Sequence, residues 1–257
     1  MALFLDGPAV TVDTLTEYDA NVLSVAAAEG INLTTKIALA QEAMELELTR
    51  LLRGSEFRDF NLLFCQRREI ENVVWSKAMR VWQVYRSLSL IYRDAYYSQL
   101  NDRHQARAKE YEVLASTARR ELVEYGLGLV SAPLLRPQQP TVELVPASEA
   151  GGTYYFAVTY TNDAGQESSA SLVMSVDVSD GNAADLTMVP SPPPTATGWN
   201  LYAGNAPEQM FRQNDVSLVL SSDWEYLPSL AITSGVKAGA GQEPDRHWRL
   251  NRYLQRG

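Results

Sequence analysis

Few residues of this sequence have the chemistry and the context for acid–base or nucleophilic catalysis. The chain has two histidines, His104 and His247, and one cysteine, Cys65. A serine or cysteine triad needs a nucleophile, a base beside it and a third group that orients the base. Neither histidine has that context, and His104 lies beside Arg103 on what the spacing indicates is the polar side of a helix. We therefore expect a solvated His104 and a protein that is not an enzyme.

Acidic side chains are the other candidates for chemistry. Glu42 and Glu45 share one helix face, but general acid–base catalysis would need a desolvated cleft that nothing in the sequence predicts. Asp177, Asp180 and Asp185 could bind calcium, yet their spacing differs from that of the twelve-residue calcium loop. A single cysteine excludes an internal disulfide and a cysteine-based zinc site. We expect no catalytic residues, no metal and no cofactor.

Charge is distributed unevenly along the chain. Residues 1–138 carry 16 Lys/Arg and 18 Asp/Glu, residues 139–245 carry 2 and 13, and residues 246–257 carry 4 and none. Such asymmetry bears on association with partners more than on fold. A basic end on an acidic body is expected to dock onto another molecule. No run approaches the roughly 20 apolar residues of a membrane span.

Helical periodicity fills the first half of the chain. Apolar residues recur at spacings of three and four, as on one buried helix face. Thr14 and Glu17 have the spacing of a capping box, and Gly30 would end the helix that follows. The pattern predicts four principal helices, at about residues 15–29, 35–53, 69–99 and 102–125, whereas residues 55–68 fit either a short helix or a packed loop. Short connections between them predict an all-α helical bundle over residues 1–130.

The second half of the chain has the pattern of a β domain. Three prolines in residues 131–140 cannot continue a helix and indicate a linker. Beyond it the hydrophobic period changes to two, with a turn at residues 162–165. Strands are predicted at 153–161, 169–178, 186–189, 198–203, 209–213, 217–220 and 224–226. Short strands separated by Gly, Pro and Asp indicate an all-β sandwich over residues 141–245.

Segments in both halves of the chain resemble proteins of tailed-bacteriophage virions. Residues 81–88 and 91–103, together with 15–19 and 28–33, resemble the head–tail adaptor proteins, also called connector or head-completion proteins. That resemblance covers about residues 10–130. Residues 152–168 and 198–202 resemble the fibronectin-III or immunoglobulin-like (Ig-like) modules that are appended to phage structural proteins. The simplest connectors lack such a module, so the chain departs from the minimal pattern.

The resemblance implies a structural virion protein at the head–tail interface, assembled in the host cytoplasm. Its copies would form a ring, a dodecamer, beneath the portal protein. The ring would continue the DNA channel toward a downstream tail or nozzle protein, and double-stranded DNA would pass through without sequence-specific contact. No membrane would be involved. Family members often grip the portal with a C-terminal extension, and the matching segment here is residues 246–257.

The residue types of that segment also predict an interface. Trp, Tyr and Arg dominate the binding energy of protein interfaces, and twelve extended residues reach about 40 Å. The expected portal-docking residues are Arg246, Trp248, Arg249, Leu250, Arg252, Tyr253 and Leu254. The alternative is a tail folded back on the acidic β domain of the same chain. We expect that deletion of residues 246–257 leaves the fold intact and abolishes portal binding.

Two further hypotheses concern surfaces. The acids of residues 13–47, together with Asp6, are candidates for the wall of a channel that repels DNA phosphate. The main alternative function is a tail fibre or decoration protein whose β-sandwich binds host-surface carbohydrate. Trp199, Tyr202 and Trp224 could then stack on sugar rings, although core packing is expected for most of them.

Overall fold

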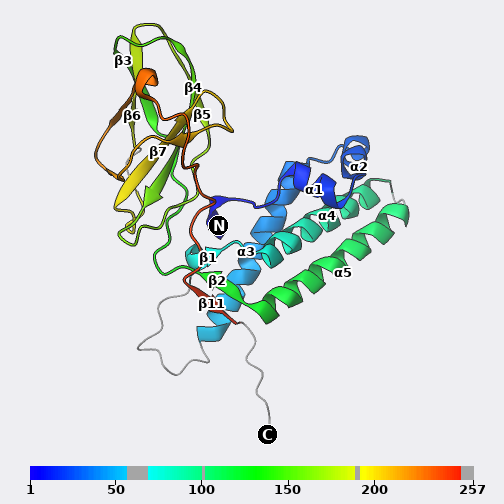
Figure 1. Ribbon diagram of the computed structural model, residues 1–257. Helices are drawn as coiled ribbons and strands as arrows, with labels where there is room; N and C mark the ends of the chain where they lie inside the picture. The colour runs from blue at the N-terminus through cyan, green and yellow to red at the C-terminus, as the bar shows by residue number, and fades with distance from the viewer. Residues whose placement is uncertain (57–68, 100–101, 189–191, 250–257) are drawn as a thin grey trace. The chain divides into compact units, whose positions relative to one another are not determined.

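The computed structural model describes residues 1–56, 69–99, 102–188 and 192–249, and it divides into two units (Figure 1). Helices occupy residues 12–125 and antiparallel sheets dominate the second half, as predicted. The helical unit comprises residues 7–131 and the chain from Pro244, and the β unit comprises residues 1–6 and 132–243. The chain therefore passes between the units three times, and neither unit is one continuous segment.

The helical unit contains five α-helices and a short 3-10 helix in its described residues. These are α1 (Val12–Tyr18), α2 (Val22–Glu29), α3 (Leu33–Glu56), η2 (Ile70–Asn72), α4 (Lys77–Gln99) and α5 (Asp102–Tyr125). The predicted helices at 35–53 and 102–125 are confirmed as α3 and α5. The uncertain stretch 55–68 lies outside the described residues apart from the end of α3. No single described helix has the length and hydropathy of a membrane span, although α2 and α3 taken together, bent by 105°, pass the same test.

The predicted helix at 15–29 is in fact two helices. Thr11 caps α1, because its hydroxyl accepts a hydrogen bond from the Thr14 amide and completes a capping box with Thr14. The box predicted for Thr14 and Glu17 is therefore wrong by one turn. The helical backbone breaks at Asp19, which is extended and buried. After it α2 runs to Gly30, whose φ of 64° ends that helix as expected.

The predicted helix at 69–99 begins only at Lys77. Before it, Val73 and Val74 form the strand β1 (Val73–Val74), which pairs with β2 (Leu127–Leu129). Both valines are fully buried, and β-branched residues favour an extended backbone. Spacing alone did not reveal this, because Val74 also fits the apolar stripe that continues along α4.

The helices of this unit are joined by buried apolar faces and by ion pairs. On α3, residues at helical spacing form one buried face: Ile37, Ala40, Met44 and Leu48. Leu51 is only half-buried, and Leu52 takes the buried position instead. Lys36 pairs with Asp94 on α4, and Glu47 pairs with Arg119 on α5. Helix α3 is thus fixed against both long helices that follow it.

A three-stranded sheet lies at one end of this unit (Figure 1). Its order is β1-β2-β11, with β11 (Arg246–Trp248) antiparallel to β2. Residues 246–248 were expected to belong to a free tail, and this expectation is wrong because they pair with Leu127–Leu129. Deletion of residues 246–257 would therefore remove a strand from the fold.

The β unit consists of two sheets. Its strands are β3 (Thr141–Pro146), β4 (Gly152–Thr161), β5 (Met174–Val178), β6 (Asn182–Thr187), β7 (Gly198–Gly204), β8 (Phe211–Arg212), β9 (Leu218–Val219) and β10 (Trp224–Tyr226), with 3-10 turns η1 (Phe4–Asp6) and η3 (Pro228–Leu230). One sheet has the order β10-β6-β3. The other has the order β5-β4-β7-β8; β8 pairs with the end of β7 at Tyr202 and Ala203, and β9 pairs with its start at Gly198 and Trp199.

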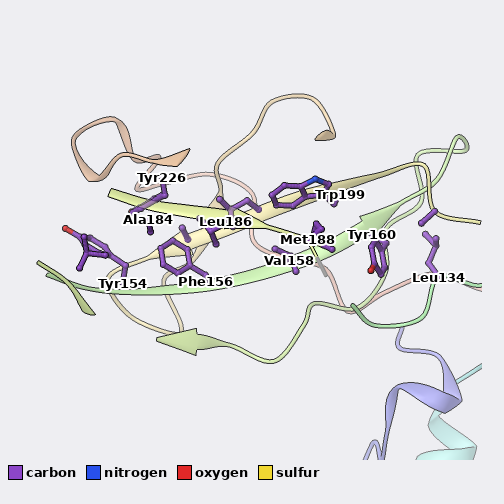
Figure 2. Close-up of a cluster of buried hydrophobic side chains, with 14 residues drawn as sticks. Leu134, Tyr154, Phe156, Val158, Tyr160, Ala184, Leu186, Met188, Trp199 and Tyr226 are labelled. Carbon is purple, nitrogen blue, oxygen red and sulfur yellow. The ribbon is translucent and has the colours of Figure 1, made fainter. Parts of the chain in front are cut away.

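Both sheets contribute to one hydrophobic core (Figure 2). Phe156, Trp199 and Leu201 come from the larger sheet, and Leu186 comes from the smaller one. Tyr226 packs edge-to-face on Phe156, with ring centroids 5.1 Å apart. Leu134, which lies inside the predicted linker, is fully buried in the same core. The proline-rich stretch from Ala132 is therefore part of the β unit and does not separate two domains.

Several strand predictions need correction. The strands at 153–161, 198–203 and 224–226 are confirmed. The strand predicted at 169–178 is regular only from Met174, and Leu172 is 65% exposed. Strand β3 was not predicted, because most of its residues are exposed on both faces and their alternation is weak. The first six residues were assigned to the helical bundle, but Asp6 bonds to Arg136 and Ser169 of the β unit.

Candidate functional site

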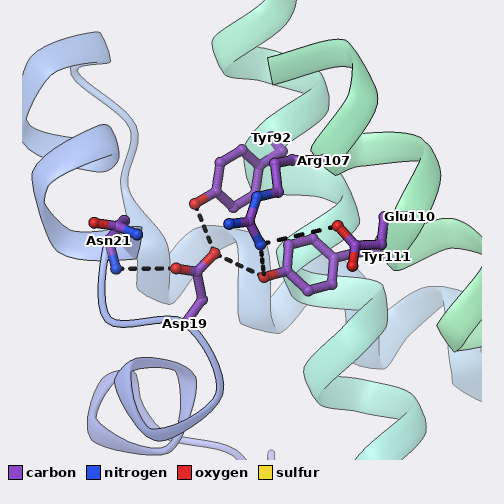
Figure 3. Close-up of polar contacts among 6 residues, drawn as sticks. All are labelled: Asp19, Asn21, Tyr92, Arg107, Glu110 and Tyr111. Carbon is purple, nitrogen blue, oxygen red and sulfur yellow. Dashed lines mark hydrogen bonds and ion pairs between the residues drawn. The ribbon is translucent and has the colours of Figure 1, made fainter. Parts of the chain in front are cut away.

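The buried carboxylate of Asp19 accepts hydrogen bonds from three donors in the helical unit (Figure 3). The hydroxyls of Tyr92 on α4 and Tyr111 on α5 each donate a hydrogen bond of 2.7 Å to Oδ2. The backbone amide of Asn21 donates to Oδ1 at 2.9 Å. The Arg107 guanidinium lies 3.5 Å from the Tyr111 hydroxyl. One carboxylate at the α1–α2 break thus ties three parts of the unit together.

Hydrogen bonding decides the protonation state of this cluster. Burial alone would raise the pKa of Asp19, but the three donors, together with the nearby charge of Arg107, outweigh it and hold the pKa below its usual value. Burial and the bond to Asp19 raise the pKa of Tyr92 and of Tyr111 well above that of a free tyrosine. Near neutral pH the carboxylate stays charged and both phenols keep their protons. The cluster is therefore suited to structural support and not to proton transfer.

A second polar group lies where α2, α4 and α5 meet. The Glu29 carboxylate accepts a hydrogen bond from Ser98, and its other oxygen lies 3.9 Å from Nε2 of His104. His104 is only 4% exposed, and its Nδ1 has no hydrogen-bond partner among the described residues. The expectation of a solvated His104 is wrong, because the helix face that carries it is covered by α2 and by the Tyr92 ring.

These three residues do not form a nucleophilic triad. In a triad the histidine must contact the hydroxyl that it activates, whereas here Glu29 contacts both Ser98 and His104. Ser98 donates to Glu29 and to the Ala95 carbonyl, and in the part of the chain that the structure describes no hydrogen bond joins it to the imidazole. The arrangement resembles the Asp19 cluster in that an acid near the end of a short helix binds the two long helices.

The β unit has its own buried polar cluster, which the sequence did not indicate. Oε1 of Glu167 accepts hydrogen bonds from Thr159, from Asn200 at 2.9 Å and from the Tyr202 hydroxyl at 2.7 Å. Burial and this bond raise the pKa of Tyr202. Glu167 follows the predicted turn, and only the folding of that turn onto β4 and β7 brings the carboxylate to these partners.

The aromatic residues considered for sugar binding are largely in the core. Trp199 and Tyr202 are fully buried, and the Trp199 indole donates to the Val219 carbonyl at 3.0 Å. Trp224 is half-buried and packs on the same core. None of the three forms an open stacking platform.

The acids considered for calcium are used separately in hydrogen bonds. Asp177 accepts from Thr153, and Asp180 accepts from the amide of Gly151. Asp185 lies on β6, in register with Glu143 and Glu225. Within the ranges that the structure describes, no three His, Cys, Asp or Glu side chains are grouped so as to hold a metal ion.

The acids considered for a channel wall are not one surface. Asp19 is buried, the Glu29 side chain is 6% exposed, and Glu47 is paired with Arg119. Asp6 belongs to the β unit. The exposed acids of that group are Asp13, Glu17 and Glu42.

The predicted docking residues separate into two sets. Arg246 and Trp248 are half-buried in β11, and Arg249 follows as an exposed residue. The remaining predicted residues, Leu250, Arg252, Tyr253 and Leu254, lie outside the described residues. Strand β11 therefore connects the basic segment directly to the helical unit. Among the described residues of the predicted tail, β11 pairs with the helical unit and not with the acidic β unit, which was the alternative.

Comparisons with protein-family profiles, with curated proteins and with solved structures give no match to this chain.

Proposed function

We propose that this chain is a structural subunit of a tailed-phage virion, a head–tail adaptor that forms a ring, a dodecamer, between the portal and the tail. The helical unit would form the ring wall around the DNA channel, and the segment after β11 would dock onto the portal. The proposal starts from the resemblance of residues 10–130 to adaptor proteins. Its partners would be further copies of itself, the portal and a downstream tail or nozzle protein.

The observation that carries this proposal is the attachment of the basic segment to the helical unit. Strand β11 pairs with β2, and Arg249 comes one residue after that strand. Residues 249–257 contain three arginines, one tyrosine and two leucines, with no acid. These residue types suit a docking site, and an anchored segment loses less conformational freedom on binding than a free tail.

We further propose that the β unit is an Ig-like or fibronectin-III-like module. Two antiparallel sheets around one core support this assignment. One feature departs from the immunoglobulin order: the first strand, β3, pairs with β6, whereas the first and second strands pair in that fold. The burial of Trp199 and Tyr202 disfavours the alternative of a carbohydrate-binding fibre or decoration protein.

The test is portal binding by a chain that ends at Arg249 and so keeps β11. Negative-stain images should show rings for this chain as for the full chain, alone or with the portal added. Its affinity for the portal should fall at least about tenfold, since a few hot-spot residues carry most interface energy. Unchanged affinity, or a monomer in the presence of portal, would contradict the proposal.

A matched pair of variants separates docking from general charge. Arg252→Gln with Arg256→Gln should weaken portal binding and reduce its salt dependence. Arg93→Gln with Arg120→Gln removes the same charge from exposed positions on α4 and α5 and should leave binding nearly unchanged.

A further inference from the structure

The edge of β2 that receives β11 is shaped for one extended segment. A Cβ atom at Gly126 would lie 2.5 Å from the Trp248 carbonyl oxygen and 3.1 Å from Cα of Arg249. At Gly128 it would lie 3.0 Å from Cβ of Pro244. Gly126 also has a φ of 94°, which favours glycine. Two glycines thus admit the two ends of residues 244–249, and we call this edge the strand slot.

Backbone pairing and one carboxylate set the register in the slot. Arg246, His247 and Trp248 pair with Leu129, Gly128 and Leu127. The amide of Asp245 donates to the Leu129 carbonyl at 3.0 Å, and the Asp245 carboxylate accepts from the Ser131 amide at 2.7 Å. Recognition through main-chain bonds with a few side-chain contacts is how extended peptides add to a sheet edge.

The occupant is less firmly buried than the slot. Leu127 and Leu129 are fully buried, and β2 keeps β1 on its other side. In β11, by contrast, Arg246 and Trp248 are half-buried and His247 is exposed. Elements with little buried surface open at low free-energy cost. Strand β11 is the less buried of the two paired strands, and so the one in which local opening is expected.

We propose that the strand slot is a peptide-binding site whose ligand is the extended segment 244–249, held reversibly and able to bind when supplied as a separate molecule. The peptide-binding claim does not depend on the proposed function. Its consequence does rest on that function: slot occupancy would position Arg249 and the docking residues that follow, so Gly126, Gly128 and Asp245 would be positioning residues for portal docking.

The experiment measures binding of a fluorescein-labelled peptide of residues 244–257 to a chain that ends at Glu243. Fluorescence anisotropy should show saturable one-to-one binding of the peptide to the shortened chain. Binding to the full chain, whose slot is already occupied, should be at least about 100-fold weaker. An Asp245→Ala peptide should bind about tenfold more weakly. Gly128→Val in the shortened chain should abolish binding, whereas Gly239→Val, at an exposed position of the β unit where a Cβ atom meets nothing nearer than 4.0 Å, should not.

A second measurement covers the case in which the shortened chain fails to fold. A protease site inserted between Gly239 and Ala240 of the full chain allows the connection to be cut after folding. The cut fragment should stay bound during gel filtration and be displaced by excess labelled peptide. No binding by a folded shortened chain, or a cut fragment that excess peptide never displaces, would overturn the proposal. Neither measurement involves the portal. A failure of the peptide-site proposal can therefore be told apart from a failure of the proposed adaptor function.

Discussion

At the scale of single residues, the buried acids determine how the helices are held together. Asp19 and Glu29 lie in a sequence region where acids were expected to face solvent or DNA. Each instead receives hydrogen bonds from the long helices. A buried carboxylate is retained only where several donors replace the lost water.

The Asp19 cluster predicts a pH-dependent stability. The folded-state pKa of Asp19 lies below its unfolded value of about 3.9. Its contribution is therefore complete above that value and is lost as the pH falls through the folded-state pKa. In urea unfolding from pH 7 to pH 2.5, Asp19→Asn should be less stable at pH 7, and the difference from the parent should shrink below about pH 4. Asp13→Asn, at an exposed position, should show no such convergence.

The tyrosine donors give a second prediction. Tyr111→Phe removes a hydroxyl that donates to a buried carboxylate and should lower the free energy of unfolding by about 1–3 kcal/mol. Tyr97→Phe changes a residue that is 67% exposed and should have almost no effect. Equal losses for both, measured by urea denaturation, would show that the cluster does not support the fold.

At the scale of elements, helix boundaries followed local chemistry where that chemistry was distinctive. Gly30 was predicted to end a helix and does so in the left-handed conformation. Strand β1 and the α1–α2 break were not predicted, because Val74 and Leu15 continue a helical spacing. Pairing with β2 and the buried Asp19 decide these positions, and both depend on residues distant in sequence.

Gly30 allows a test of a single helix end. A Cβ atom there would meet no atom within 4 Å, so the cost of a side chain is conformational. Gly30→Ala should lower the free energy of unfolding by about 1 kcal/mol, and Gly30→Asn should cost less because asparagine tolerates this conformation. Thermal and urea unfolding of the two variants would measure the difference. A larger loss of unfolding free energy for Gly30→Asn than for Gly30→Ala would contradict the prediction.

At the scale of the whole molecule, the two units are built from interleaved segments of the chain. The first six residues complete the β unit: Asp6 accepts hydrogen bonds from the Arg136 amide, the Ser169 hydroxyl and the Leu3 amide. In the same way β11 completes the helical unit. Neither assignment follows from composition. Residues 1–6 precede the helical unit in sequence but belong to the β unit, and the chain from Pro244 follows the β unit but belongs to the helical unit.

This interleaving predicts selective destabilisation. Asp6→Ala removes three acceptor contacts and should cost the β unit about 1–3 kcal/mol, while the helical unit, followed by helical circular dichroism at 222 nm, should unfold nearly as before. Asp13→Ala, in α1, is the control and should leave the unfolding of the β unit unchanged, as followed by native-state hydrogen exchange of the β4 and β7 amides. The same shift in both signals for Asp6→Ala would mean that the units unfold together.

The sequence by itself determined that the first half is helical and the second half is built of strands. It also determined the helices α3 and α5, the turn at 162–165 and several strands. These features are set by local periodicity and by glycine and proline chemistry, which are read within a few residues. Only the tertiary structure decided the roles of Asp19, His104, Glu167, Asp6 and residues 246–248. Their surroundings are formed by segments far apart in the chain, and the loss of water that governs their chemistry occurs only when those segments pack together.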